Sequence, residues 1–248
     1  MRRREHLRPA VVRGSDAMKI AVACIVPALL VACSGDDPGA PPPAPICGAE
    51  MLRSGEATYY AADGSGNCSF DPTGDLMVAA MNELDYAVGG ACGACAAIDG
   101  PSGSIVVRIV DRCPECPAGN IDLSAEAFAM IAEPIEGRVH IDWRYVTCDV
   151  TGPIVYASNA DSNPWWLAIQ IRNHRYRIAK VEARATGDSA FTELDRQEWN
   201  YFIAADGLGE GPFDFRVTDV YGGAVEDTAI ALAPGAEANG AAQLPSCD

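Results

Sequence analysis

The sequence contains very little histidine: His6, His140 and His174 are the three in 248 residues. Histidine is the commonest metal ligand in proteins and titrates near neutral pH, where it often acts as a general base. The chain also lacks a Gly-rich phosphate loop and a Ser/His/Asp arrangement. The scarcity of histidine argues against a histidine-based metal site. We expect neither a metal ion nor another cofactor.

Basic residues are also scarce, with 18 Lys and Arg against 34 Asp and Glu, a formal net charge of −16. Residues 1–33 hold six of the basic residues and two of the acidic ones, so removing this segment leaves 12 against 32 and a net charge near −20. Such a surface repels nucleic acids and anionic polymers. A neutral or basic partner fits better, and we expect no nucleic-acid partner.

The apolar run at residues 18–33, MKIAVACIVPALLVAC, is too short to span a membrane and has the length of a secretory signal peptide. It ends in Leu-Val-Ala-Cys, which resembles the lipobox of bacterial lipoproteins, where cleavage precedes the Cys and the thiol receives the lipid. We expect residues 1–33 to be a lipoprotein signal peptide, Cys33 to be the lipidation site and the chain to be exported. The alternative is a plain secretory peptide. Met1 and Met18 both fit as the start.

Two C-x-x-C pairs, Cys92/Cys95 and Cys113/Cys116, are separated by 17 residues, a spacing that also suits a zinc ribbon. Export decides against that reading, because thiols pair in an oxidising compartment. The sequence also lacks the strand–CxxC–helix context that a thioredoxin-like redox centre needs. Cys24 lies in the predicted signal peptide and Cys33 is the predicted lipidation site, so eight of the ten cysteines remain, an even number that can pair completely. We expect disulfides among Cys47, Cys68, Cys92, Cys95, Cys113, Cys116, Cys148 and Cys247.

The layout indicates a tether and two domains. Residues 34–46 are rich in Pro and Gly and predict an extended tether, followed by domains at 47–150 and 151–248. Alternating apolar residues predict strands at 104–111 and 138–146, and helices are expected at 123–132, with Ser124 as N-cap, and at 75–87. Period-2 runs at 165–173, 176–185 and 213–222 suggest a sandwich of about eight short strands.

Two carboxylates end apolar strands in the first domain, Asp111 and Asp122. Partial desolvation at such a position raises a carboxyl pKa and suits the group to general-acid chemistry. The alternative is that Asp122 caps the following helix and Asp111 caps a turn. Thr58, Tyr59 and Tyr60 add a hydroxyl and aromatic faces on another strand. Spacing alone does not bring these groups together.

Four segments, GEATYY, GGACGACAAI, IVVRIVDRCPECPAGNIDLSAEAF and NPWWLAIQIRNHRYRIAKVE, together resemble the bacterial expansins over about residues 50–235. The resemblance implies a mainly β protein, a six-stranded double-psi β-barrel with short helices followed by an antiparallel, carbohydrate-binding β-sandwich. It implies that Thr58, Asp111 and Asp122 are the functional residues of the barrel. In particular, Asp122 matches the aspartate essential for wall loosening and the general acid of the related family 45 endoglucanases.

The resemblance also implies disulfides and shows one departure. Expansins usually carry a Tyr two residues after the first Asp, where this chain has Cys113. The cysteine pattern is closer to that of plant expansins, which implies the pairs Cys68–Cys92 and Cys95–Cys148. The pairs Cys113–Cys116 and Cys47–Cys247 are then what remains.

Hydrolysis of a glycosidic bond needs a second carboxylate. In family 45 enzymes the base follows the Thr-x-Tyr strand, and the nearest acid here is Asp63, one residue beyond the expected place. A shift of one residue turns a strand side chain to the other face. We therefore read Asp63 as a turn residue. An acid without a base predicts a groove that binds glucan without cutting it.

Aromatic residues of the second domain predict a flat sugar-binding platform, because exposed rings stack on the apolar faces of pyranoses. The resemblance places Trp165, Trp166 and Trp199 in it. Tyr201 either shares that face or fills the core, and core packing is also an alternative for the tryptophans. Family members often have a Lys six residues before the first Trp, where this chain has Asn159.

The sequence thus predicts a monomeric, lipid-anchored or secreted protein that binds β-1,4-glucan and loosens plant cell-wall polysaccharide without hydrolysis. One alternative is an enzyme, either an endoglucanase or a peptidoglycan lytic transglycosylase, with Asp122 as its general acid. A third hypothesis is an adhesion module with the barrel as scaffold.

Overall fold

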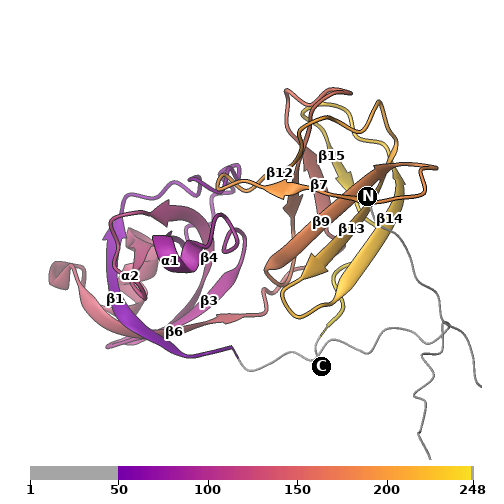
Figure 1. The fold of residues 1–248 in the computed structure, drawn as a ribbon. Helices are drawn as coiled ribbons and strands as arrows, with labels where there is room; N and C mark the ends of the chain where they lie inside the picture. The colour runs from indigo at the N-terminus through magenta and orange to yellow at the C-terminus, as the bar shows by residue number, and fades with distance from the viewer. Residues whose placement is uncertain (1–49, 247–248) are drawn as a thin grey trace, which may run out of the picture. The chain divides into compact units, whose positions relative to one another are not determined.

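The computed structural model describes residues 50–246, and Figure 1 shows their path. Residues 1–49 and 247–248 lie outside the described part, and with them the predicted signal peptide, the tether, Cys33, Cys47 and Cys247. All described residues fall within one compact unit. Within residues 50–246, no helix has both the length and the apolar character needed to cross a membrane.

Six strands close into a barrel with the order β1-β5-β2-β4-β3-β6, which confirms the predicted barrel. The β1–β5 and β2–β4 pairs are parallel, and the other pairs along this order are antiparallel. The strands are β1 (Arg53–Tyr60), β2 (Val78–Asn82), β3 (Cys95–Gly100), β4 (Gly103–Cys113), β5 (Ile121–Ser124) and β6 (Val139–Val146).

Alternation of apolar residues fills the barrel. On β4, Ile105, Val107 and Ile109 face inward, and they share a core with Trp143 from β6 and Met81 from β2. Helix α2 (Ala125–Ile131) contacts β1, β4 and β5 and buries Phe128 in the same core (Figure 1). Its N-cap is Ser124, whose hydroxyl accepts from the Ala127 N–H, as predicted. The 3-10 helix η1 (Pro134–Glu136) follows.

The helix predicted at residues 75–87 is mostly wrong. Residues 78–82 form strand β2 and only α1 (Glu83–Tyr86) is helical. All five residues of β2 are buried, and the strand lies between β5 and β4 in the barrel. A short strand that is buried on both faces has no alternation, so its sequence pattern does not distinguish it from a buried helix.

The other nine strands within residues 50–246 form two antiparallel sheets, one strand more than the eight or so expected. The orders are β10-β9-β13-β14 and β11-β12-β8-β7-β15, and Figure 1 shows β13 between β9 and β14. The bounds are β7 (Val155–Ser158), β8 (Leu167–Arg172), β9 (Ile178–Ala185), β10 (Thr192–Glu193), β11 (Asp195–Arg196), β12 (Phe202–Ala204), β13 (Phe213–Asp219), β14 (Ala224–Ile230) and β15 (Glu237–Asn239).

Three predicted disulfides are present: Cys68–Cys92, Cys95–Cys148 and Cys113–Cys116. The first joins two barrel loops, the second joins β3 to the segment after β6, and the third closes a short turn after β4. The zinc-ribbon alternative for Cys92, Cys95, Cys113 and Cys116 is therefore wrong, because the sulfur of each is bonded to another cysteine sulfur.

Candidate functional site

Four residues on neighbouring strands lie side by side in what we call the acidic row: Thr58, Asp122, Ala80 and Asp111. Thr58 on β1 is the register partner of Asp122 on β5, and Ala80 on β2 is the partner of both Asp122 and Asp111 on β4. Register partners lie side by side on one face of a sheet. The small side chain of Ala80 thus separates two carboxylates that stand two strands apart.

A β-bulge sets the direction of Asp111. Ala79 pairs with Ile109, whereas Ala80 pairs with Asp111, so Val110 is an extra residue on β4. Because one inserted residue reverses which side chains face a given side, the bulge turns Asp111 toward the row. Bulges commonly re-aim side chains in this way next to functional sites.

Asp122 is a partly desolvated acid with one strong hydrogen bond. The Thr58 hydroxyl donates to Asp122 Oδ1 at 2.5 Å. Burial raises the pKa of Asp122, the Thr58 bond opposes that rise, and the nearby charges of Glu115 and Asp111 add to it. The carboxyl therefore holds its proton more tightly than an exposed aspartic acid does. It does not cap the helix, since Ser124 does.

Asp111 is held by backbone donors. Its Oδ1 accepts from the N–H of Asn67 at 2.7 Å and from its own neighbour Arg112 at 2.8 Å. Gly66 permits this arrangement, because a Cβ there would lie 2.4 Å from the Asp111 Cβ. The chain at residues 66–67 therefore packs directly on Asp111 and fixes its carboxylate.

The two tyrosines of β1 differ in environment. Tyr59 is 40% exposed, and its ring lies 4.8 Å from that of the buried Phe128. The Tyr60 hydroxyl is buried without a hydrogen-bond partner among the described residues. Burial is the main reason that the pKa of Tyr60 lies far above its usual range, and the negative charges of Asp111 and Asp122 raise it further. Tyr60 thus lies close to both acids of the row.

Asp63 does not join the row. Its carboxylate accepts from the backbone N–H and the hydroxyl of Ser65, at 2.9 Å and 2.6 Å, in an exposed turn. The two hydrogen bonds lower its pKa. Asp63 is therefore a turn residue, as predicted.

The predicted platform residues lie at both ends of the antiparallel β8–β12 pair. Trp165 and Trp166 come just before β8, and Trp199 comes just before β12. Trp165 is 77% exposed, whereas Trp166 and Trp199 are half-buried. Tyr201 is 9% exposed and packs 4.7 Å from the Trp199 ring, so it supports that ring from behind. Of the alternatives for Tyr201, the structure thus favours core packing.

Gly207 allows the turn after β12 to pack against the first tryptophan. Its φ is +68°, and a Cβ there would lie 2.1 Å from the Pro164 carbonyl oxygen and 2.5 Å from the Trp165 backbone. Asn163 reinforces this loop, since its side-chain oxygen accepts from the Trp165 N–H at 3.0 Å. The backbone under Trp165 is thus fixed, while its ring stays open to solvent.

Sequence reasoning missed the link between the row and the platform. The Asn67 amide donates to the Tyr86 hydroxyl and to the Glu198 carbonyl, both at 2.9 Å, and the Glu198 carboxylate pairs with Arg112 at 2.8 Å. Glu198 directly precedes Trp199. An asparagine next to a cysteine in a glycine-rich loop gives no signal of this role, because its partner Glu198 is 131 residues away in the sequence.

The fold and the acidic row define a double-psi β-barrel protein with a β-sandwich attached. The family described as "Lytic transglycolase" matches residues 54–143. Expansin-YoaJ of Bacillus subtilis is 35% identical over 183 residues, covering 71% of this chain and 78% of the relative. Expansin-like protein 1 of Dictyostelium discoideum is 31% identical over 185 residues, covering 69% of this chain and 64% of the relative.

Solved structures of expansins have a similar fold. The crystal structure of an expansin from Clavibacter michiganensis has a TM-score of 0.73 at 30% identity, covering 79% of this chain and 99% of the other. A mutant of that expansin in complex with cellohexaose has a TM-score of 0.72 at 28% identity and the same coverage. The chain belongs to the expansin family.

Proposed function

We propose that this protein binds β-1,4-glucan and loosens contacts between cell-wall polysaccharides without hydrolysing them. The observation that carries the proposal is the acidic row itself. Asp122 is an acid of raised pKa, and the nearest candidate base from the sequence, Asp63, is committed to Ser65 in an exposed turn. The row can therefore bind and polarise a glycosidic oxygen, but it has no base at the expected place. The cellohexaose complex of the Clavibacter expansin supports a glucan ligand.

The platform supplies affinity in this proposal. Trp165, Trp166 and Trp199 stack on glucose rings, with Tyr201 behind Trp199. Tyr59 and Tyr60 add aromatic faces at the barrel. Neutral glucan also suits a chain of net charge −16, because such a chain repels a polymer that is anionic along its whole length.

The proposal places the protein outside the cell. Residues 1–33 act as a signal peptide, Cys33 carries the lipid, and residues 34–46 hold domains 47–150 and 151–248 away from the membrane. Cys47 pairs with Cys247, and the protein acts as a monomer. The support for these points is the sequence pattern.

One observation favours a second candidate, an enzyme that cuts a glycan. Asp111 and Asp122 are two strands apart, which corresponds to about 9.5 Å between backbones. Inverting glycosidases hold their carboxyl groups roughly 6.5–9.5 Å apart to admit the attacking water. The match of residues 54–143 to the family described as "Lytic transglycolase" points the same way.

The test measures soluble reducing ends released from amorphous cellulose by the purified protein and by Asp122→Asn. We expect no release from either protein, retention of both on the cellulose pellet, and mechanical weakening of wall strips by the first alone. Release that disappears in Asp122→Asn would establish the enzyme and refute the non-hydrolytic proposal. Retention without weakening would leave an adhesion module.

A further inference from the structure

A cavity of about 450 Å³ lies away from the acidic row and the aromatic platform. Part of its wall comes from β4, including Val107 and Arg108, and part from residues 148–150 and 172–174. Its volume falls in the range of about 300–1,000 Å³ that is typical of small-molecule sites. Neither Asp111, Asp122 nor any tryptophan lines it.

The Arg108 guanidinium has no anionic partner. It lies 4.1 Å above the Phe70 ring, and it makes no hydrogen bond or ion pair with a side chain or carbonyl of residues 50–246. The charges that act on it belong to Arg172 and Asp75, both of which line the cavity. A half-buried guanidinium carries five donors in a planar fork, and a carboxylate is the group that satisfies them in pairs.

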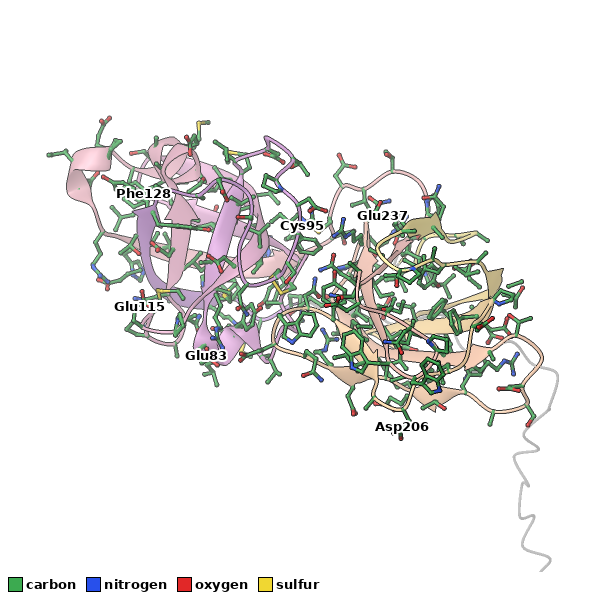
Figure 2. All side chains as sticks on the ribbon, turned by 90° about the horizontal axis from the view of Figure 1, so that it is seen from above. Glu83, Cys95, Glu115, Phe128, Asp206 and Glu237 are labelled. Atoms are coloured by element: carbon green, nitrogen blue, oxygen red, sulfur yellow. A yellow bond between two sulfur atoms is a disulfide. The ribbon has the colours of Figure 1, made fainter. Side chains whose placement is uncertain are left out.

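The second arginine of the cavity is already satisfied. Arg172 pairs with Asp71 at 2.8 Å and with Glu237, labelled in Figure 2, at 2.5 Å. Its Nε donates to the Gln170 side-chain oxygen. Arg172 therefore completes the wall, and Arg108 is the cation left for a ligand.

The same wall also offers acceptors. His174 Nδ1 lies 2.7 Å from the Tyr176 carbonyl oxygen, which can only accept, so Nδ1 carries the proton and Nε2 is an acceptor. Burial lowers the His174 pKa to about 4, so the ring is neutral at pH 7. Asp75 and Asp149 also line the cavity, and Asp75 uses one oxygen to accept from the Met77 N–H.

These groups favour a ligand that has both a carboxylate and hydroxyl groups. An inorganic anion would satisfy Arg108 but leave the carboxylates of the wall facing a like charge. A neutral sugar would satisfy the acceptors but leave the guanidinium without an anion. A sugar acid does both, because its carboxylate faces Arg108 and its hydroxyls donate to His174, Asp75 and Asp149.

We propose that this cavity binds a uronic acid, with its carboxylate on Arg108. The ligand is either the free sugar acid or a uronic acid side group on a glycan. The site adds recognition of a charged sugar to the proposed glucan binding, and it does not depend on the row or the platform.

The test titrates the purified protein with D-glucuronate, D-glucose and acetate at constant ionic strength, by calorimetry and by NMR shifts of cavity residues. We expect saturable binding of glucuronate, and binding at least tenfold weaker for glucose and acetate. Arg108→Gln should weaken glucuronate binding tenfold or more, and Arg108→Lys should weaken it less, because lysine keeps the charge but not the fork.

The matched control is Arg216→Gln, since Arg216 lies on β13 and pairs with Glu226 and Glu182. It should bind glucuronate like the parent protein. Circular dichroism and thermal melting show whether each variant is folded, and Arg108→Lys carries the test if Arg108→Gln is not. A glucuronate-substituted xylo-oligosaccharide that binds more tightly than glucuronate identifies a glycan side group, and equal or weaker binding identifies the free acid. Glucuronate binding that is absent, equal to that of glucose, or unchanged in the folded Arg108 variants would overturn the proposal.

Discussion

Asn67 donates its backbone N–H to Asp111 Oδ1 at 2.7 Å, and through this bond a loop of the barrel fixes the carboxylate of the acidic row. The side chain of the same residue donates to the carbonyl of Glu198, next to Trp199. One residue thus connects the acid of the barrel to the segment that carries a platform aromatic.

Asn67→Ala should destabilise the protein by about 1–2 kcal/mol, because two side-chain hydrogen bonds are lost at a partly buried position. Urea unfolding measures this loss. Asn239→Ala, at an exposed position on β15, is the control and should change stability by less than about 0.5 kcal/mol. Retention of Asn67→Ala on cellulose together with reduced wall weakening would support a positioning role. Unchanged stability would contradict the link.

The carboxyl of Asp122 should lower the stability of the folded protein at neutral pH. Burial raises its folded-state pKa above the ordinary 3.8, so the folded protein binds this proton more tightly than the unfolded chain does. The resulting stabilisation is fully present below the unfolded pKa and is lost as pH rises through the folded pKa. Asp122→Asn should therefore raise the melting temperature relative to the parent at pH 7, with a smaller gain at pH 3.

Thr58→Val should raise the pKa of Asp122 further, because the Thr58 hydroxyl stabilises the ionised carboxylate. NMR titration of the Asp122 carboxyl carbon measures the shift. Thr192→Val, at an exposed position on β10, should leave the titration unchanged. A pKa that falls in Thr58→Val would show that the hydrogen bond does not favour the ionised form.

Replacing Trp165 and Trp166 together by Ala should reduce retention on cellulose at least tenfold. The Trp165 ring is 77% exposed, so losing it costs little folding energy. Trp199→Ala should also weaken binding, and it should destabilise the fold by about 1 kcal/mol through its contact with Tyr201. Ile135→Ala, at a residue 94% exposed on η1, is the control for loss of an exposed apolar side chain. Full retention of the double variant would refute the platform.

The disulfides should differ in their contribution to stability according to the loops that they close. Cys95–Cys148 spans 53 residues and should contribute about 4 kcal/mol by loop entropy, whereas Cys113–Cys116 spans 3 and should contribute about 1.5 kcal/mol. Double Cys→Ser variants of each pair, compared by urea unfolding, measure the difference. A larger loss for the short pair would show that its role at the end of β4 outweighs chain entropy.

Much of the fold was predictable from local pattern. The alternation along β4, β6 and β9, the Ser124 cap and the Asp-Gly turn at Asp63 follow from side-chain period and turn chemistry. These signals lie within a few residues of one another. Strand β2 escaped prediction because a strand with both neighbours hydrogen-bonded and every side chain buried carries no alternation.

The sequence by itself determined the chemical groups: an acid after an apolar strand, a Thr two residues before the end of another, paired tryptophans and six cysteines that form three disulfides. Only the tertiary structure decided how they meet. Barrel closure set Thr58 beside Asp122, and a one-residue bulge turned Asp111 toward Ala80. Long-range contacts placed Asn67 against Glu198 and left the Arg108 guanidinium at the wall of a cavity. Such pairings depend on strand register and barrel closure. Both arise from the packing of the whole chain, so they cannot be predicted from the residues next to each site in the sequence.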